Sequence, residues 1–118
     1  MFNLEARLKS LGYSDLDDYI DRSSNETLFD EVWLWRKKAG IEEKFEGADK
    51  KKIEYILEEI IIKIIEKGGR IVDYSNGIGQ KFIDENIHLP VDEFAQKIVE
   101  FSMNNPDYGY DGGGIWFE

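Results

Sequence analysis

An isoleucine-rich segment in the middle of the chain constrains the fold more than any other feature of the sequence. Between residues 50 and 67, apolar side chains recur at intervals of three and four: Ile53, Ile56, Leu57, Ile60, Ile61, Ile64 and Ile65. This spacing places them on one face of an α-helix, and Gly68-Gly69 can end that helix in a left-handed conformation. The β-branched side chains would suit a strand, but the alternation of period two is missing. We therefore predict a long helix that forms the spine of the core.

Two short helices are predicted ahead of this segment. Leucines spaced by four and three residues predict the first over residues 4–11, and Gly12 can end it. An S-x-x-D capping pattern, formed by Ser14 and Asp17, predicts the start of the second helix.

A third helix is predicted between residues 24 and 40. Ser24 or Asn25 can cap its start, and Gly40 can end it. Its apolar face is broad and is formed by Leu28, Phe29, Val32, Trp33 and Trp35. A face of this breadth indicates a largely buried helix.

Strand signals follow the long helix. The sequence RIVDYS (70–75) predicts a strand, NGIG (76–79) a turn, and QKFID (80–84) a return strand that would complete a hairpin. The C-terminal GIWFE (114–118) predicts a closing strand.

One more helix is predicted between the hairpin and the closing strand. Pro90 is tolerated in a first turn, and the sequence Asn104-Asn105-Pro106 breaks the apolar spacing. This helix and the isoleucine helix are expected to cover one face of the sheet. The pattern as a whole predicts an α+β fold, with four to five helices and a small antiparallel sheet of two to three short strands, in a single domain over residues 1–118.

Composition narrows the class of protein. With 42% hydrophobic and 14% aromatic residues, the chain is too apolar for an intrinsically disordered one. The first residues carry charge at Glu5, Arg7 and Lys9, which indicates neither a signal peptide nor a membrane span. The absence of cysteine favours the cytoplasm.

Negative charge is the most informative bulk property. The net charge is −10, and it is concentrated in two regions: residues 14–35 hold seven acids and one base, and residues 71–118 hold nine acids and two bases. A field of this sign repels nucleic acid and anionic membranes, and it speeds the encounter with a basic protein. The ordinary alternative is that the charge serves solubility.

Enzymatic signals are weak. The chain has no cysteine nucleophile and a single histidine, His88, for which no triad partner can be placed. Adjacent acids such as Asp17-Asp18 point in different directions on a helix and do not converge on a substrate. A pocket that uses Asp73, Tyr74 or His88 would be needed for an enzyme or a ligand-binding domain. No cofactor is predicted.

The tail NNPDYGYDGGGIWFE can be interpreted as a ligand loop. A phosphate cradle built from Gly112, Gly113 and Gly114 would need a following helix, which the remaining residues cannot provide. A calcium loop is a weak candidate, because Asp107, Asp111 and Glu118 match part of the EF-hand pattern.

The same tail can instead form a protein-recognition surface. Tyr108, Tyr110 and Trp116 would supply rigid apolar contacts, and Asp107 and Asp111 would supply charge for a basic partner. The structural alternative has equal weight. In it, Trp116 and Phe117 alternate across a terminal strand and the glycines form a connector.

A second acidic contact patch is predicted at Asp15, Asp17, Asp18, Asp21 and Asp30-Glu31. Asp15 and Asp17 can also be explained by the dipole of a capped helix, since carboxylates stabilise the first turn. The excess of acids beyond the first turn favours a binding partner.

A small, acidic, cysteine-free chain with tyrosines among its carboxylates resembles the immunity proteins that neutralise nuclease toxins of bacteriocin and contact-dependent inhibition systems. The residues that carry this resemblance are Asp15 to Asp21 and Asp107 to Asp111. The resemblance is one of character, without a family motif. It implies a basic toxin domain as partner, held by charge and aromatic contacts.

Two alternatives remain open from the sequence. The first is a phage-type nucleic-acid mimic that inhibits a host defence protein by the same mechanism. A toxin gene immediately upstream would favour immunity, and a phage early region would favour the mimic. The second is a small ligand-binding or enzymatic α+β domain.

Overall fold

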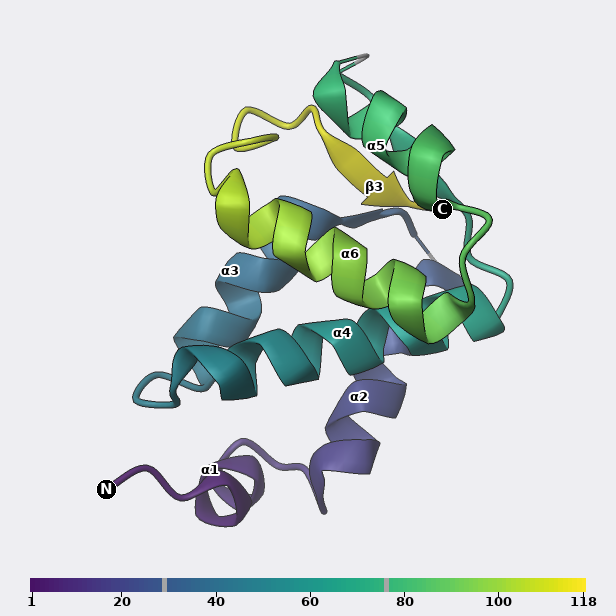
Figure 1. The fold of residues 1–118 in the computed structure, drawn as a ribbon. Coiled ribbons are helices and arrows are strands. Elements are labelled where there is room, and N and C mark those ends of the chain that lie inside the picture. The colour runs from purple at the N-terminus through teal and green to yellow at the C-terminus, as the bar shows by residue number, and fades with distance from the viewer. Residues whose placement is uncertain (29, 76) are drawn as a thin grey trace.

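Helices form most of the chain, and three short strands complete the fold (Figure 1). The computed structural model describes residues 1–28, 30–75 and 77–118. Its elements, in chain order, are α1 (Leu4–Ser10), α2 (Leu16–Ser24), the 3-10 helix η1 (Asn25–Leu28), β1 (Val32–Trp33), α3 (Leu34–Lys44), α4 (Lys50–Glu66), β2 (Ile71–Asp73), α5 (Ile78–Asn86), α6 (Val91–Asn104) and β3 (Ile115–Phe117). Within the described residues, six α-helices and a three-stranded antiparallel sheet confirm the α+β prediction, with slightly more helices than predicted.

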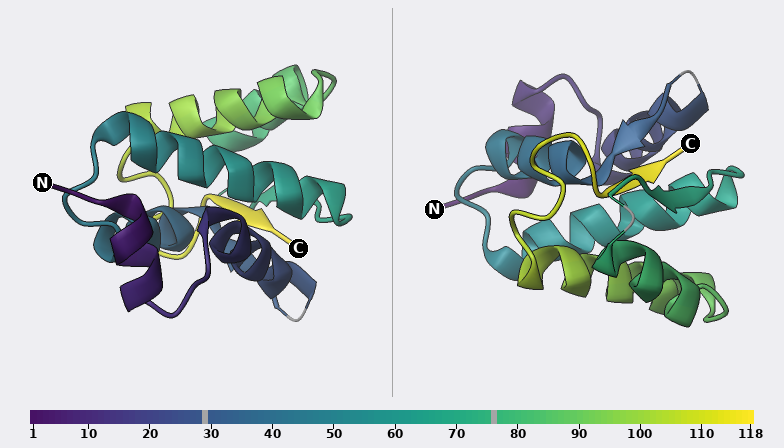
Figure 2. Two further views of the ribbon diagram at one scale, coloured as in Figure 1. Left: turned by 90° about the horizontal axis from the view of Figure 1, so that it is seen from below. Right: turned by 90° about the horizontal axis from the view of Figure 1, so that it is seen from above.

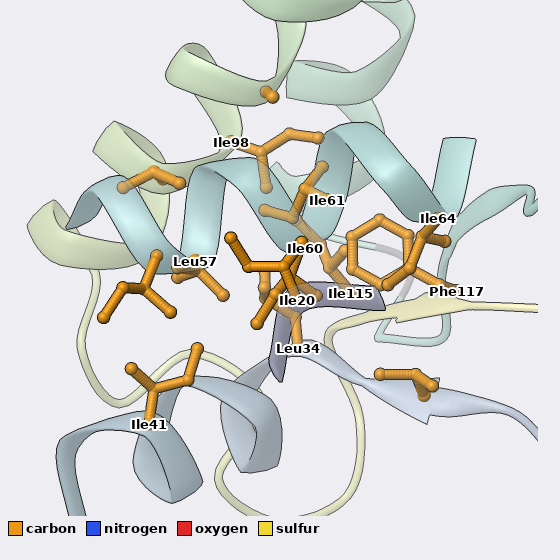
Figure 3. Close-up of a cluster of buried hydrophobic side chains, with 14 of the residues drawn as sticks. Ile20, Leu34, Ile41, Leu57, Ile60, Ile61, Ile64, Ile98, Ile115 and Phe117 are labelled. Atoms are coloured by element: carbon orange, nitrogen blue, oxygen red, sulfur yellow. The ribbon is translucent and has the colours of Figure 1, made fainter. Parts of the chain in front are cut away.

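The predicted isoleucine helix is α4, and it is the spine of the core. Asp49 caps its start by accepting a hydrogen bond of 2.8 Å from the Lys52 N–H, and Gly68 follows its end with φ +92°. Helices α2, α3 and α6 pack against it. Its apolar side chains meet those of α2, α3, α6 and β3 in one cluster (Figure 3).

The sheet has the strand order β1-β3-β2, so the C-terminal strand lies in the middle. Both pairings are antiparallel, and Trp116 of β3 lies opposite Trp33 of β1 and Val72 of β2. Side chains alternate across β3: Ile115 and Phe117 are buried in the core, and the Phe117 ring lies beside Ile64 of α4 (Figure 3). Trp116 therefore points to the opposite, outer face of the sheet.

The predicted hairpin is wrong. The sequence QKFID belongs to α5. Strand β2 pairs with the C-terminal strand β3, and not with a strand formed by residues 80–84. The helix starts there because the Asp73 carboxylate accepts hydrogen bonds from the N–H groups of Gly77 (3.3 Å) and Gln80 (2.7 Å). The carboxylate thus supplies an acceptor to the first turn of α5, where the Gln80 N–H also reaches the Gly77 carbonyl at 3.2 Å.

The predicted third helix is also wrong in its first half. Val32 and Trp33 form strand β1, α3 begins only at Leu34, and it continues through Gly40 to Lys44. Leu28 belongs to η1, and Phe29 lies outside the described residues.

The start of the second helix is shifted by one residue from the prediction. Asp15 is the N-cap of α2 and accepts a hydrogen bond of 2.8 Å from the Asp18 N–H. Four other predicted elements are confirmed within a few residues: the helices at 4–11 and after Pro90, and the strands at 70–75 and 114–118.

Candidate protein-binding face

Aromatic rings cover the outer face of the sheet. The indole rings of Trp33 and Trp116 stack with 5.7 Å between their centroids and an interplanar angle of 7°. Trp35, in the first turn of α3, stacks on the other side of Trp33 at 5.3 Å. The ring of Tyr74 meets Trp116 edge to face at 6.0 Å. We call the residues Trp33, Tyr74 and Trp116 the tryptophan face.

The tryptophan face lies on the side of the sheet away from α4. In the view from above, β1 and β3 have no helix in front of them (Figure 2, right). Trp33 and Trp116 are half-buried, and Tyr74 is 52% exposed. Among the described residues no acceptor lies within reach of the buried indole N–H of Trp33. An unpaired buried donor costs about 1–3 kcal/mol.

A cleft of about 790 Å³ adjoins the tryptophan face and is lined by Trp33, Trp116, Val32 and Tyr19. Burial raises the pKa of Tyr19 to about 12, so this phenol stays protonated at neutral pH. The cleft is also lined by four acidic residues: Glu26, Asp30, Glu31 and Glu43.

Three basic residues line the same cleft, and two of them have internal partners. The Nζ of Lys37 lies 2.8 Å from a carboxylate oxygen of Glu26. The Nζ of Lys44 lies 5.7 Å from the centroid of the Tyr19 ring. Arg36 is the third, and it is exposed on α3. Asp30, Glu31 and Glu43 are all exposed, so their carboxylates are available to a partner.

Carboxylates also surround Tyr74. Its hydroxyl donates a hydrogen bond of 2.8 Å to Oε1 of Glu118, whose other oxygen lies 3.6 Å from Arg70. The hydrogen bond to Glu118 is the main cause that raises the pKa of Tyr74, and the nearby charge of Glu31 adds to it. Glu31 and Glu118 therefore give the tryptophan face a negative border.

The glycine-rich tail folds back against the same region. The Trp116 indole N–H donates to the carbonyl oxygens of Gly112 (3.1 Å) and Gly113 (3.3 Å). Gly109, Gly112 and Gly114 have positive φ angles, which explains why glycine recurs here. The tail thus acts as a structured connector that fixes the Trp116 ring.

The predicted tail contacts divide into two groups. Tyr110 is 65% exposed, and Asp107 and Asp111 are exposed. Asp111 also accepts a hydrogen bond of 3.1 Å from the Gly113 N–H, which an asparagine could accept equally. Tyr108 differs from these residues, since it is half-buried and packs edge to face on Phe101 at 5.5 Å.

The acids of the predicted patch on α2 serve the fold in part. Asp15 caps the helix, and Asp18 lies 2.7 Å from Arg22 and accepts from the Ser14 N–H at 3.0 Å. The hydrogen bond with Arg22 lowers the pKa of Asp18 far below its ordinary value. These two carboxylates stabilise the fold, and this role does not require a partner protein.

Asp21 and Asp17 complete that patch. Asp21 receives a hydrogen bond of 2.8 Å from Lys67, whose Nζ also donates to Ser24 and Asn25. Asp17 is exposed and makes no hydrogen bond or ion pair with another described residue.

The carboxylates of the calcium hypothesis are not brought together. Glu118 is engaged with Tyr74 and Arg70, and Asp111 with the backbone of its own turn. Across residues 1–28, 30–75 and 77–118, no three acidic or histidine side chains converge as metal ligands.

The residues predicted to form an enzyme or ligand pocket each have a different position or contact in the fold. Asp73 accepts hydrogen bonds at the start of α5, Tyr74 is bonded to Glu118, and His88 is exposed between α5 and α6. Asp30 and Glu31 were predicted as part of the second acidic patch, whereas Trp33 was missed as a site residue because it was assigned to a buried helix face. The uninterrupted apolar run Val32-Trp33-Leu34-Trp35, rich in β-branched and aromatic residues, was the available signal for a strand.

Comparisons with protein-family models, curated proteins and solved structures gave no match to this chain. In the part of the chain that is described, no helix has both the length and the apolar character needed to cross a membrane.

Proposed function

We propose that this chain is a stoichiometric inhibitor that binds a basic, nucleic-acid-acting protein, in the manner of an immunity protein against a nuclease toxin. The observation that carries the proposal is the stack of Trp33 and Trp116 on an outer sheet face that is bordered by carboxylates. Tryptophan and tyrosine are enriched in binding hot spots because they bury much area at little entropic cost.

Charge supports the class of partner. The net charge of −10 favours a basic protein and disfavours direct contact with nucleic acid. Carboxylates at Glu31, Asp107 and Asp111 would stand where a nuclease normally meets phosphates. We place this encounter in the cytoplasm, where a nuclease toxin reaches its substrate.

The proposal is tested by affinity capture from the source lysate at low and high salt, followed by an activity titration. A face variant, Asp107→Asn, Asp111→Asn and Glu31→Gln, removes three charges beside the tryptophan face. A matched variant, Glu5→Gln, Glu46→Gln and Glu93→Gln, removes three exposed charges on α1, the α3–α4 connection and α6. The two variants have the same net charge, so they separate a local contact from the overall field.

The expected result is capture of one basic protein that salt releases, because screening weakens attraction between opposite charges. Its nuclease activity should fall to zero at one equivalent of wild-type chain and of the matched variant, but not of the face variant. If the face variant and the matched variant lose inhibition to the same extent, the tryptophan face is excluded as the binding site. A captured protein whose activity is unchanged by the chain would exclude inhibition.

A further inference from the structure

The outer edge of β1 carries main-chain groups for which no partner is found among the described residues. Arg70 and Glu118 exchange two hydrogen bonds of 2.8 Å, and the Tyr74 N–H donates to Gly114. Hydrogen-bonded pairs alternate along an antiparallel ladder, so the main chain of Trp116 points toward β2 and that of Phe117 toward β1. Trp33, opposite Trp116, therefore directs its N–H away from the sheet.

By the same alternation, the main chain of Glu31, two residues before Trp33, is directed away from the sheet. The Glu31 N–H bonds to Oδ1 of Asp30 at 2.8 Å, and no described residue donates to the Glu31 carbonyl. The Trp33 carbonyl is directed into the first turn of α3, since Trp33 is the N-cap. The edge thus offers one acceptor, on Glu31, and one donor, on Trp33, on either side of Val32.

This pair of groups fits a strand that runs parallel to β1. In a parallel pair, one residue of the added strand lies beside a residue of the edge strand and bonds to that residue's two neighbours in sequence. Beside Val32, its N–H would donate to the Glu31 carbonyl and its carbonyl would accept from the Trp33 N–H. The bridging residue would lie beside Val32, on the side of Tyr19, and its two neighbours would lie on the side of Trp33. Room exists there, because Val32, Trp33 and Tyr19 line the cleft of about 790 Å³.

Charge identifies the occupant. The bridging residue meets Val32 and Tyr19 and should be apolar, whereas its neighbours meet the indole stack, Asp30 and Glu31. Lysine or arginine there gains from the exposed carboxylates of Asp30 and Glu31. A second copy of the chain is disfavoured, since it would bring the same acidic edge and a net charge of −10.

We infer that the chain binds its partner by strand addition, with an extended segment of alternating basic and apolar residues pairing with the outer edge of β1. The inference rests on the proposed function for the basic nature of the partner. It adds a mode of recognition in which main-chain hydrogen bonds supplement the contacts of the tryptophan face.

The test uses a capped heptapeptide of alternating lysine and valine and isotope-labelled full-length chain. Two control peptides have N-methylated valines or glutamate in place of lysine. At saturation with the lysine peptide, hydrogen exchange at the Trp33 main-chain N–H should slow about tenfold or more. The Val32 N–H, already in the ladder with Phe117, should change much less. Neither control peptide should bind.

Three results would overturn strand addition. They are no chemical-shift change at about 1 mM lysine peptide, binding without slower exchange at Trp33, and equal binding of the N-methylated peptide. Each leaves the stoichiometric inhibition intact, because that is measured by nuclease activity with the captured protein. Conversely, a protected Trp33 N–H together with absent inhibition would retain the docking mode and exclude the proposed function.

Discussion

The hydroxyl of Tyr108 donates a hydrogen bond of 2.6 Å to Oδ2 of Asp73, and this bond ties the glycine-rich tail to the start of α5. The same hydroxyl accepts from the Gly79 N–H at 3.1 Å. Burial, followed by the bond to Asp73, raises the pKa of Tyr108. Asp73 therefore organises both the first turn of α5 and the tail.

Removal of this hydroxyl should destabilise the fold. A hydrogen bond to a charged acceptor contributes about 1.5–3 kcal/mol, so Tyr108→Phe should lower the free energy of unfolding by about that amount. Urea titration measures the loss. Tyr110→Phe is the matched control, because Tyr110 is 65% exposed, and it should change stability by less than about 0.5 kcal/mol. Equal effects of the two changes would contradict the role given to Tyr108.

Two glycines should respond to alanine in opposite directions. A Cβ at Gly79 would lie 2.8 Å from Oδ2 of Asp73 and 2.9 Å from the Tyr108 ring, so Gly79→Ala should destabilise by about 1–3 kcal/mol. Gly40 lies inside α3 with no atom within 4 Å of an added Cβ. Gly40→Ala should stabilise by about 0.5–1 kcal/mol, because alanine restricts the unfolded chain.

Thermal or urea melts of both alanine variants check this pair. A stabilising Gly79→Ala would show that α5 can shift away from the tail. A destabilising Gly40→Ala would show that the continuation of α3 through residue 40 is incorrect.

Elements with a strong local signal could be predicted from the sequence. The apolar period of α4, its Asp49 cap and the left-handed Gly68 each depend only on residues that are near in the sequence. The same holds for α6, which begins directly after Pro90. Local propensity and tertiary structure agree in these segments, so the pattern was sufficient.

Elements whose cause lies far along the chain could not be predicted. Val32 and Trp33 are a strand because they pair with Phe117 and Trp116, near the other end of the chain. Read locally, the same residues fit a helical face. The start of α5 was missed for a different reason: Gly77 provides no side-chain cap, and the nearby Asp73 carboxylate takes that place.

The candidate site was predicted only in part. The predicted alternation of Trp116 and Phe117 across a terminal strand is confirmed, since Phe117 is buried in the core and Trp116 lies on the outer face. The role of Trp116 as a partner contact stays a prediction. Its stacking partner Trp33 and the cleft beside it depend on the β1–β3 register, which no local pattern encodes. The acids on α2 remain predicted contacts, but the ion pairs of Asp18 with Arg22 and of Asp21 with Lys67 give two of them a role in the fold as well.

Lys67 should be a structural lysine. Its Nζ donates to Oδ1 of Asp21 (2.8 Å), to Ser24 (2.8 Å) and to Asn25, and so joins the end of α4 to the end of α2. Lys67→Met keeps the length of the side chain but removes the charged donor that joins the two helix ends. The expected loss is about 1–3 kcal/mol in the free energy of unfolding, measured by urea titration.

Lys63→Met provides the control for this lysine. The Nζ of Lys63 lies 3.9 Å from Glu66, and both side chains are about half exposed. Exposed pairs of this kind contribute at most about 1 kcal/mol. A larger loss at Lys63 than at Lys67 would contradict the structural role of Lys67.

Asp18 should make the stability of the protein depend on acid. Its hydrogen bond with Arg22 lowers the folded-state pKa well below the ordinary 3.8, so the folded protein holds the ionised form more strongly than the unfolded chain. This contribution is fully present above that value and is lost as the pH falls below about 4.

Asp18→Asn should therefore be less stable than wild type at pH 7, and the difference should shrink toward pH of about 2–3. Urea midpoints measured across this range provide the test. Asp17→Asn, at an exposed neighbour without an ion pair, should lower the stability at pH 7 by less than Asp18→Asn. A gap between wild type and Asp18→Asn that is unchanged from neutral to acid pH would show that the Arg22 pair does not hold in solution.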